Sequence, residues 1–483
     1  MNFKTVFLEV MRTEPINNWA QLLQSDPYLL TAVELMGKIE ALGGEALIVG
    51  GAVRDILLKK PAHDIDIATN VDVDIIGQHF KTHDIGKSRD FGIVNVLYGD
   101  YAFEIANYRA EAGYSDNRRP DIIHKVKSFE KDSERRDLTF NALGLDRHGT
   151  IIDYQNGIED LQNKIVRAVG NAQERFIEDS LRLIRVARFA AKFGFQIEPE
   201  TRQAMVDLSH LVDNVSAERI HDELFKIAEV SGEALANYLE HLDNVGILQR
   251  MLPEIHVMHD FEHTPATHPE GGVFKHTMAA LRASESRDPI TNLGILFHDV
   301  GKPVTRGYTD SEGKPNRGIG TVSYKGHEAE GMPIFQKIAN RLKFSNKEKE
   351  AILFAIEHHM KGHKIKDLKQ SSILKLRHSP HWPHLKHTFR ADDASRGHPL
   401  FNPKEFSDRM DYIETIYKKF GETQEFEKRM SVLVNGKMIM ELIPTAKGAE
   451  IGRIKSATRE MIISKDFNVS QSDVNQFIIA MNR

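Results

Sequence analysis

The sequence predicts an α/β or α+β head followed by a mostly α-helical chain. Between about residues 46 and 146, short apolar strands such as IVNVLYG and YAFEIANY alternate with short helices, which is typical of a mixed domain. Beyond Leu161 the apolar residues recur at helical spacing through most of the remaining chain. The 483 residues exceed the size at which one hydrophobic core stops growing, so we expect several domains.

Five segments follow from these patterns. Val33, Met36, Ile39 and Leu42 recur at helical spacing before Gly43-Gly44, which predicts a helix at the end of an N-terminal extension. Histidines are concentrated in one part of the chain, since 15 of the 23 lie between residues 256 and 398. We therefore expect an N-terminal helical extension, the head, a helical neck, a histidine-rich domain and a helical tail, over residues 1–45, 46–146, 147–249, 250–395 and 396–483 respectively.

Composition excludes several classes of protein. The chain has no cysteine, so disulfides, thiolate metal sites and a cysteine nucleophile are excluded, and any metal must be held by His, Asp or Glu. No segment has the apolar length of a signal-peptide core or a membrane span, so we expect a cytoplasmic protein with no membrane partner. The formal net charge of −5 argues against a protein that coats nucleic acid uniformly, but it is compatible with a local basic face.

A Gly-Gly turn opens the most informative segment, LIVGGAVRDILLKKPAHDIDIATN. A short strand leads into Gly50-Gly51, and residues 53–58 have the pattern of a helix. Two glycines at such a junction let backbone N–H groups approach a phosphate closely, and Arg54 adds a positive charge. A Gly-Gly turn alone is more often a structural corner. The phosphate interpretation therefore depends on the acidic residues that follow.

Three acidic residues complete the predicted catalytic set. Asp64 and Asp66 flank Ile65 in a β-like run, so both carboxylates face the same side. Two carboxylates held together repel one another unless a cation lies between them, and Mg²⁺ with its oxygen ligands suits them. Glu104, within YAFEIANY, is the candidate for a third carboxylate. Metals at these groups can activate a hydroxyl and stabilise the leaving oxygen of an in-line phosphoryl displacement, which predicts nucleotidyl transfer.

Four motifs in order across residues 47 to 190 carry a family resemblance. GGAVRD, DID, RRDLTFNAL and RFIEDSLRLIRVARF resemble class II tRNA nucleotidyltransferases and bacterial poly(A) polymerases, of the DNA polymerase beta superfamily. The resemblance implies that Gly51 and Arg54 contact the incoming nucleotide, and that Arg136 and Asp137 help to hold its triphosphate and sugar. It also implies that YSDNRRPD, at residues 114–121, is the family's flexible loop.

The fourth motif implies a protein template for the base. In the family, the positions that match Glu178, Asp179 and Arg182 read the incoming nucleotide. Cytosine and adenine both present an amino donor beside an unprotonated ring nitrogen, so an Asp can accept from the amine while an Arg donates to the nitrogen. Asp179 and Arg182 are three apart on a predicted helix and are expected to be neighbours. Arg185 and Arg188 continue this spacing but rotate around the helix, so they should reach the triphosphate or a structural carboxylate.

A second set of motifs resembles the HD phosphohydrolase superfamily. It consists of His276, the pair His298-Asp299 in LGILFHDVGKP, and either Asp392 or Asp393 in RADDASRGH. Such residues can meet on helices around a metal, and imidazoles with carboxylates suit Mn, Ni, Co or Zn better than Mg²⁺.

Other histidines extend this second set. His327, together with His358 or His359, is a candidate ligand group for a second metal. A lone histidine is usually a structural residue, but an HDxGK motif after a long apolar run makes that interpretation less favourable here.

The C-terminal segment LVNGKMIMELIPTAKGAEIGRI resembles the tail of many CCA-adding enzymes, with departures. Met438 stands where an acidic residue is usual, and residues 447–449 read Lys-Gly-Ala where Pro-Gly-Pro is common. The resemblance therefore predicts a helical tail that helps to bind tRNA and leaves its detailed contacts open.

Together, the motifs are most like those of bacterial-type CCA-adding enzymes with an HD domain. This resemblance implies that CTP and ATP supply C, C and A to the 3′ end of tRNA at a Mg²⁺ site, and that the HD site hydrolyses phosphate esters with Ni²⁺, Mn²⁺ or Co²⁺. The alternatives are a poly(A) polymerase, an enzyme of partial CC or A addition, and an HD phosphohydrolase whose head only binds RNA. A nicotinamide-binding protein is disfavoured because VGGAVRD lacks the third glycine of GxGxxG. The oligomeric state stays open.

Overall fold

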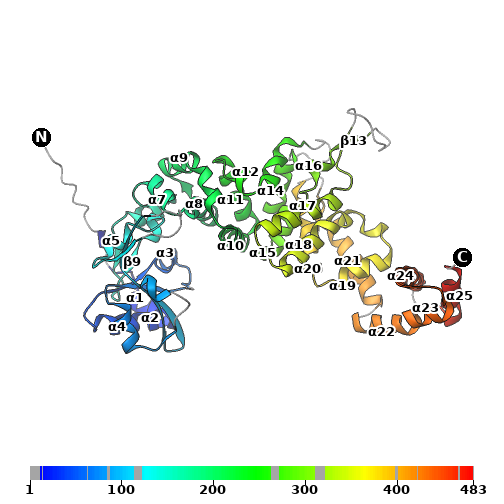
Figure 1. Ribbon diagram of the computed structural model, residues 1–483, viewed down its shortest axis with the longest axis horizontal. Coiled ribbons are helices and arrows are strands. Elements are labelled where there is room, and N and C mark those ends of the chain that lie inside the picture. The colour runs from blue at the N-terminus through cyan, green and yellow to red at the C-terminus, as the bar shows by residue number, and fades with distance from the viewer. Residues whose placement is uncertain are drawn as a thin grey trace. The chain divides into compact units, whose positions relative to one another are not determined.

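A computed structural model describes residues 11–12, 15–62, 64–83, 88–113, 122–262, 271–309, 321–396, 401–420, 423–465 and 468–481. The chain divides into two compact units, of which the first comprises Met1–Ile227 with Asn237–Pro253 and the second Ala228–Ala236 with Glu254–Arg483. Most strands lie in the blue and cyan part of the ribbon, whereas the green to red part is mostly helical (Figure 1). The predicted fold class, a mixed head followed by a mostly helical chain, is confirmed. None of the helices in the described ranges is long and apolar enough to cross a bilayer.

A mixed eight-stranded sheet forms the centre of the first unit, with the order β1-β10-β9-β2-β3-β6-β5-β4. β3 and β6 are parallel, and the other neighbouring strands are antiparallel. The strands of this sheet are β1 (Met11–Arg12), β2 (Ala46–Val49), β3 (Asp66–Thr69), β4 (Thr82–His83), β5 (Ile93–Tyr98), β6 (Tyr101–Asn107), β9 (Gly144–Leu145) and β10 (Ile151–Asp153). The sheet thus includes strands on both sides of the expected 46–146 head segment.

The core of this sheet includes an N-terminal helix. Leu29, Leu35 and Ile39 of α2 (Pro27–Glu40) are buried in one cluster with Ile48 of β2 and Ile67 of β3. The expected helix thus begins earlier than its apolar spacing indicates, and part of the expected extension belongs to the head. The further helices on this side of the chain are α1 (Trp19–Ser25), α3 (Gly51–Leu57) and α4 (Val73–His79). The sequence did not predict α1, a helix of seven residues whose Trp19, Leu22 and Leu23 are only partly buried against the core.

Beyond the head, helices predominate as expected. α8 (Leu181–Phe193) buries most of its residues and ends at Gly194, whose φ of 67° favours glycine. The other helices of this part are α5 (Phe129–Ser133), α6 (Gly157–Asn163), α7 (Ala172–Glu178), α9 (Pro199–Asp207), α10 (Ala217–Ala228), α11 (Gly232–Asn244), α12 (Leu248–Met251) and α13 (Pro253–His256). Two small pairs of strands accompany them, β7 (Arg109–Ala112) with β8 (Ile122–Lys125) and β11 (Ile165–Val166) with β12 (Gln196–Ile197).

Helices also build the second unit, together with the hairpin of β13 (Gly307–Thr309) and β14 (Thr321–Ser323). α15 is buried along almost its whole length, as the apolar run before the HD motif predicts. The helices are α14 (Val273–Arg282), α15 (Pro289–Phe297), α16 (Lys302–Thr305), α17 (His327–Arg341), α18 (Asn346–His358), η5 (His359–Asp367), α19 (Gln370–His378), α20 (Trp382–Ser395), α21 (Pro403–Phe420), α22 (Thr423–Leu433), α23 (Gly436–Leu442), α24 (Ala449–Ser464) and α25 (Gln471–Ala480).

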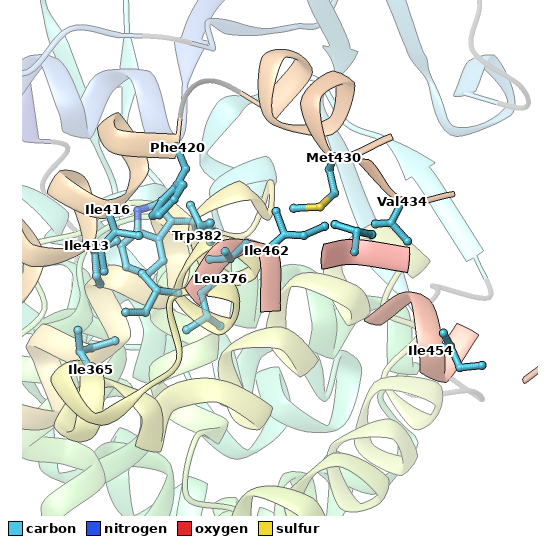
Figure 2. Close-up of a cluster of buried hydrophobic side chains, with 14 of the residues drawn as sticks. Ile365, Leu376, Trp382, Ile413, Ile416, Phe420, Met430, Val434, Ile454 and Ile462 are labelled. Atoms are coloured by element: carbon cyan, nitrogen blue, oxygen red, sulfur yellow. The ribbon is translucent and has the colours of Figure 1, made fainter. Parts of the chain in front are cut away.

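One apolar cluster joins the end of the histidine-rich segment to the tail. Figure 2 shows Ile416 and Phe420 of α21 near Trp382 of α20, and the same cluster continues through Val434 to Ile462 of α24. The tail therefore packs against α19 and α20 through a shared core. The predicted helical character of the tail is confirmed in its described residues, despite the unusual residues at 438 and 447–449.

Candidate active sites

A tight turn joins β2 to α3 at Gly50-Gly51. Gly50 has φ 71° and ψ −129°, a conformation that residues with a side chain rarely adopt. A Cβ on Gly50 would also lie 3.5 Å from Nη1 of Arg136. Arg54 is buried and donates from Nη1 to Oδ1 of Asn141 at 2.6 Å. The chain therefore brings two arginines to the glycine turn that the sequence singles out.

Three carboxylates meet where β3 begins. Asp66 is the first residue of β3, and Glu104 is its paired neighbour on the parallel strand β6. All three side chains, including that of Asp64, reach solvent. Partial desolvation and the negative charges of Glu104 and Asp64 together raise the pKa of Asp66 to about 6. The positive charge of Arg136 opposes this shift. A divalent cation would relieve this repulsion, so the donor set fits Mg²⁺.

The residue between the two aspartates is held by α2. Ile65 donates its backbone N–H to the hydroxyl of Tyr28 at 3.2 Å. The Tyr28 ring stacks on Phe103 of β6, with 5.1 Å between centroids and 15° between planes. Sequence reasoning missed Tyr28, because a tyrosine near the start of an amphipathic helix carries no signal of a distant partner.

The RRD motif is organised around a buried acid that the sequence did not single out. Asp132 is fully buried and accepts hydrogen bonds from Arg135 at 2.8 and 2.9 Å and from Arg136 at 2.8 and 3.2 Å. Burial alone would raise the pKa of Asp132, but the two guanidinium groups lower it below its usual value. One carboxylate therefore fixes both arginines of the motif.

Arg185 and Arg188 reach carboxylates, which was one of the two expectations for them. Arg185 donates to Oδ2 of Asp137 at 2.6 and 2.8 Å, and Arg188 forms a buried ion pair with Glu223. Although burial opposes it, the positive charge of Arg185 holds the pKa of Asp137 well below its usual range. Asp137 is thus an anion that orients an arginine in this structure.

The base-template motif does not lie on one continuous helix. α7 ends at Glu178, and Asp179 has an extended backbone with φ −140° and ψ 104°. Oδ1 of Asp179 then accepts the N–H of Leu181 at 3.0 Å in the first turn of α8. The prediction that Asp179 and Arg182 share a helix is therefore wrong, because Asp179 satisfies a backbone donor at the start of α8. The two residues are still joined by a backbone hydrogen bond of 2.9 Å.

Each template side chain has a definite partner. Asp179 accepts two hydrogen bonds from Arg219 of α10, at 2.9 and 2.7 Å. Arg182 donates to Glu178 at 2.7 Å and to the backbone oxygen of Arg135 at 2.7 Å. Arg219 was missed because it follows Asp179 by 40 residues, and its own helix is a charged amphipathic segment with no motif.

A single cleft of about 550 Å³ brings the head residues together. Its lining includes most of the predicted set, namely Gly50, Gly51, Arg54, Asp64, Asp66, Arg136, Asp137, Asp179, Arg182, Arg185 and Arg188. Glu104 and Glu178 contribute through Asp66 and Arg182, beside which they lie. The cleft adds Asn141, Lys192 and Arg219, which the sequence did not identify. The expected loop at 114–121 lies outside the described residues.

In the second unit, predicted HD residues converge in the interior. Nε2 of His276 lies 3.4 Å from Oδ2 of Asp299 and 3.2 Å from Oδ1 of Asp392. Nε2 of His298 lies 3.1 Å from Oδ2 of Asp299. These four residues are at most 4% exposed. Nitrogen and oxygen atoms that converge in this way fit a transition metal.

A second pair of histidines lies on the other oxygen of Asp299. Nε2 of His327 is 3.2 Å and Nε2 of His359 is 3.7 Å from Oδ1 of Asp299, and the two nitrogens are 2.9 Å apart. His358 instead packs on the ring of Phe354, with 4.6 Å between centroids. The structure therefore selects His359 over His358, two alternatives that the sequence left open.

Contacts to the rings fix which nitrogen faces the centre. Nδ1 of His298, His327 and His359 each lies 2.7 to 2.8 Å from a backbone oxygen three residues earlier, to which it donates its proton. Because Nδ1 is the donor to the backbone, Nε2 is the nitrogen that is directed at Asp299 and is placed to bind a metal.

Asp392 and Asp393 have different environments. Asp392 faces His276, whereas Asp393 forms an ion pair with Arg409 and lies 2.9 Å from Nδ1 of His363. Nε2 of the same His363 lies 2.9 Å from Oδ2 of Asp392. Asp392 is thus the carboxylate that joins the cluster, and His363 orients it.

Three family profiles match consecutive parts of this chain. The Poly A polymerase head domain matches residues 46–167. The probable RNA and SrmB-binding site of polymerase A matches residues 194–258, and the HD domain matches residues 266–416.

Two curated proteins of similar sequence are CCA-adding enzymes. A CCA-adding enzyme of Lactobacillus delbrueckii subsp. bulgaricus is 43% identical over 198 residues, and one of Enterococcus faecalis is 47% identical over 197 residues. The chain is similar in sequence to these CCA-adding enzymes over the matched segment. These matches cover 41% of the chain and 50% and 48% of the respective relatives, so the chain spans about half the length of the curated CCA-adding enzymes that it matches. The predicted family resemblance is confirmed.

Solved structures of CCA-adding enzymes share the fold over nearly the whole chain. The Bacillus stearothermophilus CCA-adding enzyme in complex with CTP aligns with a TM-score of 0.67 at 22% identity, covering 95% of this chain and 98% of that chain. The Thermotoga maritima CCA-adding enzyme complexed with tRNA aligns with a TM-score of 0.54 at 16% identity, covering 96% and 98%. At these identities the likeness to CCA-adding enzymes concerns the fold.

Proposed function

We propose that this chain is a tRNA nucleotidyltransferase that adds C, C and A to the 3′ end of tRNA from CTP and ATP. The observation that carries the proposal is the head cleft, where Asp64 and Asp66 share one lining with Asp179 and with seven arginines, including Arg182 of the template pair. A carboxylate cluster beside concentrated positive charge suits a nucleoside triphosphate with its metal ions. The names of the curated relatives and of the solved structures support the same activity.

In this proposal the acidic end of the cleft positions the reacting groups. Asp64 and Asp66 hold Mg²⁺, with Glu104 beside them, and the bound ions would supply charge stabilisation for the attacking 3′ oxygen and the departing pyrophosphate. The backbone at Gly50-Gly51, with Arg54 and the cations fixed by Asp132, receives the triphosphate. Glu104, paired with Asp66 on the neighbouring strand, is the proposed third carboxylate of this catalytic set.

The template residues keep hydrogen-bonding capacity for a base. A carboxylate has about four acceptor sites, and Asp179 uses three of them on Leu181 and Arg219, which leaves one on Oδ2 among the described contacts. The guanidinium of Arg182 has five N–H donors, and its contacts with Glu178 and two backbone oxygens use three. Cytosine and adenine match the remaining acceptor and donors, whereas uracil and guanine do not.

The test supplies purified protein with tRNA that lacks its 3′ terminus, together with CTP and ATP singly and in combination. Sequenced products should end in C, C and A, with A added only after CTP has been used. Runs of A would instead support a poly(A) polymerase, and products that stop after CC or that accept only A would support a partial enzyme. Asp64→Ala and Asp66→Ala should each abolish addition while tRNA binding is retained. Extension by a folded double variant would contradict the metal assignment.

Base choice needs a separate test. Asp179→Ala or Arg182→Ala should admit UTP or GTP more than it lowers total catalysis, because the discriminating hydrogen bonds are lost while the carboxylates remain. An unchanged preference for CTP and ATP in both variants would exclude the template role.

We further propose a metal-dependent phosphohydrolase activity at the HD centre. Convergence of four histidine Nε2 atoms on Asp299, with Asp392 beside them, carries this proposal. Ni²⁺, Mn²⁺ or Co²⁺ fits these donors, and when bound it would supply Lewis-acid activation for hydrolysis of a phosphate ester. The chain's own residues hold the donors in place through the Nδ1 contacts and through His363. A terminal or cyclic phosphate at the 3′ end of RNA is the proposed substrate, since its removal exposes the hydroxyl that the head extends.

The assay supplies tRNA ending in a 2′,3′-cyclic phosphate with each of the three metals. His298→Ala with Asp299→Ala should abolish hydrolysis and leave addition to an intact 3′-hydroxyl almost unchanged. If the wild-type protein hydrolyses nothing with any of these metals, the HD proposal fails and the head proposal is unaffected.

A further inference from the structure

A cavity opens beside the HD centre and carries more positive charge than the proposed metal ligands account for. It has a volume of about 340 Å³ and is lined by Asp299, His327 and Asp392 from the centre. Four cationic side chains also line it, namely Lys302, Lys325, Lys364 and Arg396. The acidic side chains of the lining are Asp299, Glu328 and Asp392.

Two of these cations already serve the HD centre. Lys302 is buried, and its Nζ lies 2.5 Å from Oδ2 of Asp299. Arg396 lies 3.9 Å from Oδ1 of Asp392 and 3.2 Å from Nε2 of His363. Their charges are therefore balanced by the carboxylates of the centre.

Lys325 and Lys364 differ from them. Both are exposed, and the described part of the chain offers neither of them an ion pair within 4.0 Å. Lys325 lies in the turn between β14 and α17, directly before Gly326 and two residues before His327. Lys364 interrupts η5 with a non-helical backbone, φ −119° and ψ 25°. Two separate segments thus bring positive charge to the mouth of one cavity, where the described lining adds Glu328 to the acidic residues of the HD centre.

The positive charge at the mouth is separate from the groups that would face the reacting phosphate. The phosphate that reacts must face the metals that Asp299 and Asp392 are proposed to bind. The positive charge of those metals compensates the charge of this phosphate. Positive charge at the mouth is then complementary to a second anionic group on the same ligand.

We propose that Lys325 and Lys364 form a subsite for a second phosphate, next to the phosphate that reacts at the HD centre. The inference rests on the proposed phosphohydrolase function of that centre. The substrate class is a nucleotide that carries at least two phosphates, which a free nucleotide bisphosphate or the end of an RNA chain can supply. A ligand that continues beyond the reacting phosphate can meet lysines at the open mouth of the cavity without entering the interior.

The test compares three substrates with the full-length protein in Mn²⁺. They are a nucleoside 2′,3′-cyclic phosphate, the same compound with an added 5′-phosphate, and a trinucleotide that ends in a 2′,3′-cyclic phosphate. The wild type should show a lower KM for the second and third substrates than for the first, and the advantage should shrink at high salt. A clear preference for the trinucleotide over the bisphosphate would identify an RNA end as the source. Equal KM values for all three would overturn the subsite.

A double variant locates the effect. In Lys325→Ala with Lys364→Ala, KM for the substrates with two or more phosphates should rise about tenfold, because two partly solvated charge contacts are lost. The kcat, and the KM for the substrate with one phosphate, should stay unchanged. Lys366→Ala is the matched control, since this lysine is exposed on the same η5 helix but does not line the cavity. An equal rise in KM for all three substrates, or the same rise in the control, would refute the subsite.

A binding measurement separates this inference from the proposed hydrolysis. The trinucleotide should protect Lys325 and Lys364, but not Lys366, from acetylation read out by mass spectrometry. Protection without hydrolysis would mean that the phosphohydrolase proposal fails while the phosphate subsite stands. Hydrolysis without protection would mean the reverse.

Discussion

The contact between Arg219 and Asp179 predicts that Arg219 contributes to the choice of nucleotide base. The position of Arg219 in the sequence does not suggest this role. Arg219→Ala removes two charge-assisted hydrogen bonds, at 2.9 and 2.7 Å, from the carboxylate proposed to read the base amine. The side chains are 22% and 20% exposed, so we take the lower end of the range for hydrogen bonds to charged groups, about 1.5 kcal/mol. Since about 1.4 kcal/mol corresponds to a tenfold ratio, discrimination against UTP and GTP should fall about tenfold.

The assay is the ratio of kcat/KM for CTP or ATP to that for UTP or GTP on the same tRNA. The ratio is needed because loss of a positive charge from the cleft weakens the binding of all four triphosphates, whereas loss of orientation at Asp179 affects base choice. Arg219→Lys is the matched control, since it keeps the charge but cannot form the two-pronged contact, and it should show most of the fidelity loss. An unchanged ratio in a folded Arg219→Ala protein would refute the role assigned to this contact.

Three further predictions concern the head. Tyr28→Phe removes the acceptor of the Ile65 N–H but keeps the ring, so the Mg²⁺ concentration for half-maximal addition should rise severalfold with little change in Tm. An unaltered Mg²⁺ titration would show that Tyr28 does not position the aspartates. The pKa of Asp66 is raised to about 6, and its carboxyl group must lose a proton before a cation binds. Mg²⁺ affinity should therefore be full above this pH and should fall about tenfold per pH unit below it. An affinity for Mg²⁺ that does not change with pH would contradict the environment assigned to Asp66. Asp132→Ala leaves Arg135 and Arg136 without their buried counter-charge, so the free energy of unfolding should drop by about 3–5 kcal/mol in denaturant titrations. A loss below about 1 kcal/mol would exclude a structural role for Asp132.

Local patterns predicted the parts of the fold that depend on neighbouring residues. The strand before Gly50 was placed correctly as β2, and the helix after the turn is α3. The spacing of Asp64 and Asp66 placed both carboxylates in one cleft. In each case the local conformation is decided by side chains that repeat every two residues in a strand or about every 3.6 residues in a helix, or by the wide range of backbone angles open to glycine.

The helix break at Asp179 shows where this reasoning stops. The segment RFIEDSLRLIRVARF has helical spacing throughout, yet Asp179 is extended and its side chain accepts the N–H of Leu181. The side chains of Asp and Ser can accept hydrogen bonds from nearby backbone N–H groups and so compete with the helix. The carboxylate of Asp179 also binds Arg219, which follows it by 40 residues. Periodicity cannot encode that contact.

The sequence by itself determined the kinds of chemistry available, namely a mixed head with an acidic pair behind a glycine turn, and a histidine and aspartate set without cysteine. Only the tertiary structure decided which residues meet. It chose His359 rather than His358 and Asp392 rather than Asp393, and it supplied Tyr28 and Asp132 as supports. The physical reason is that residue type and the local spacing of residues determine the chemistry and direction of a side chain. The packing of segments far apart in the chain determines which groups that side chain contacts.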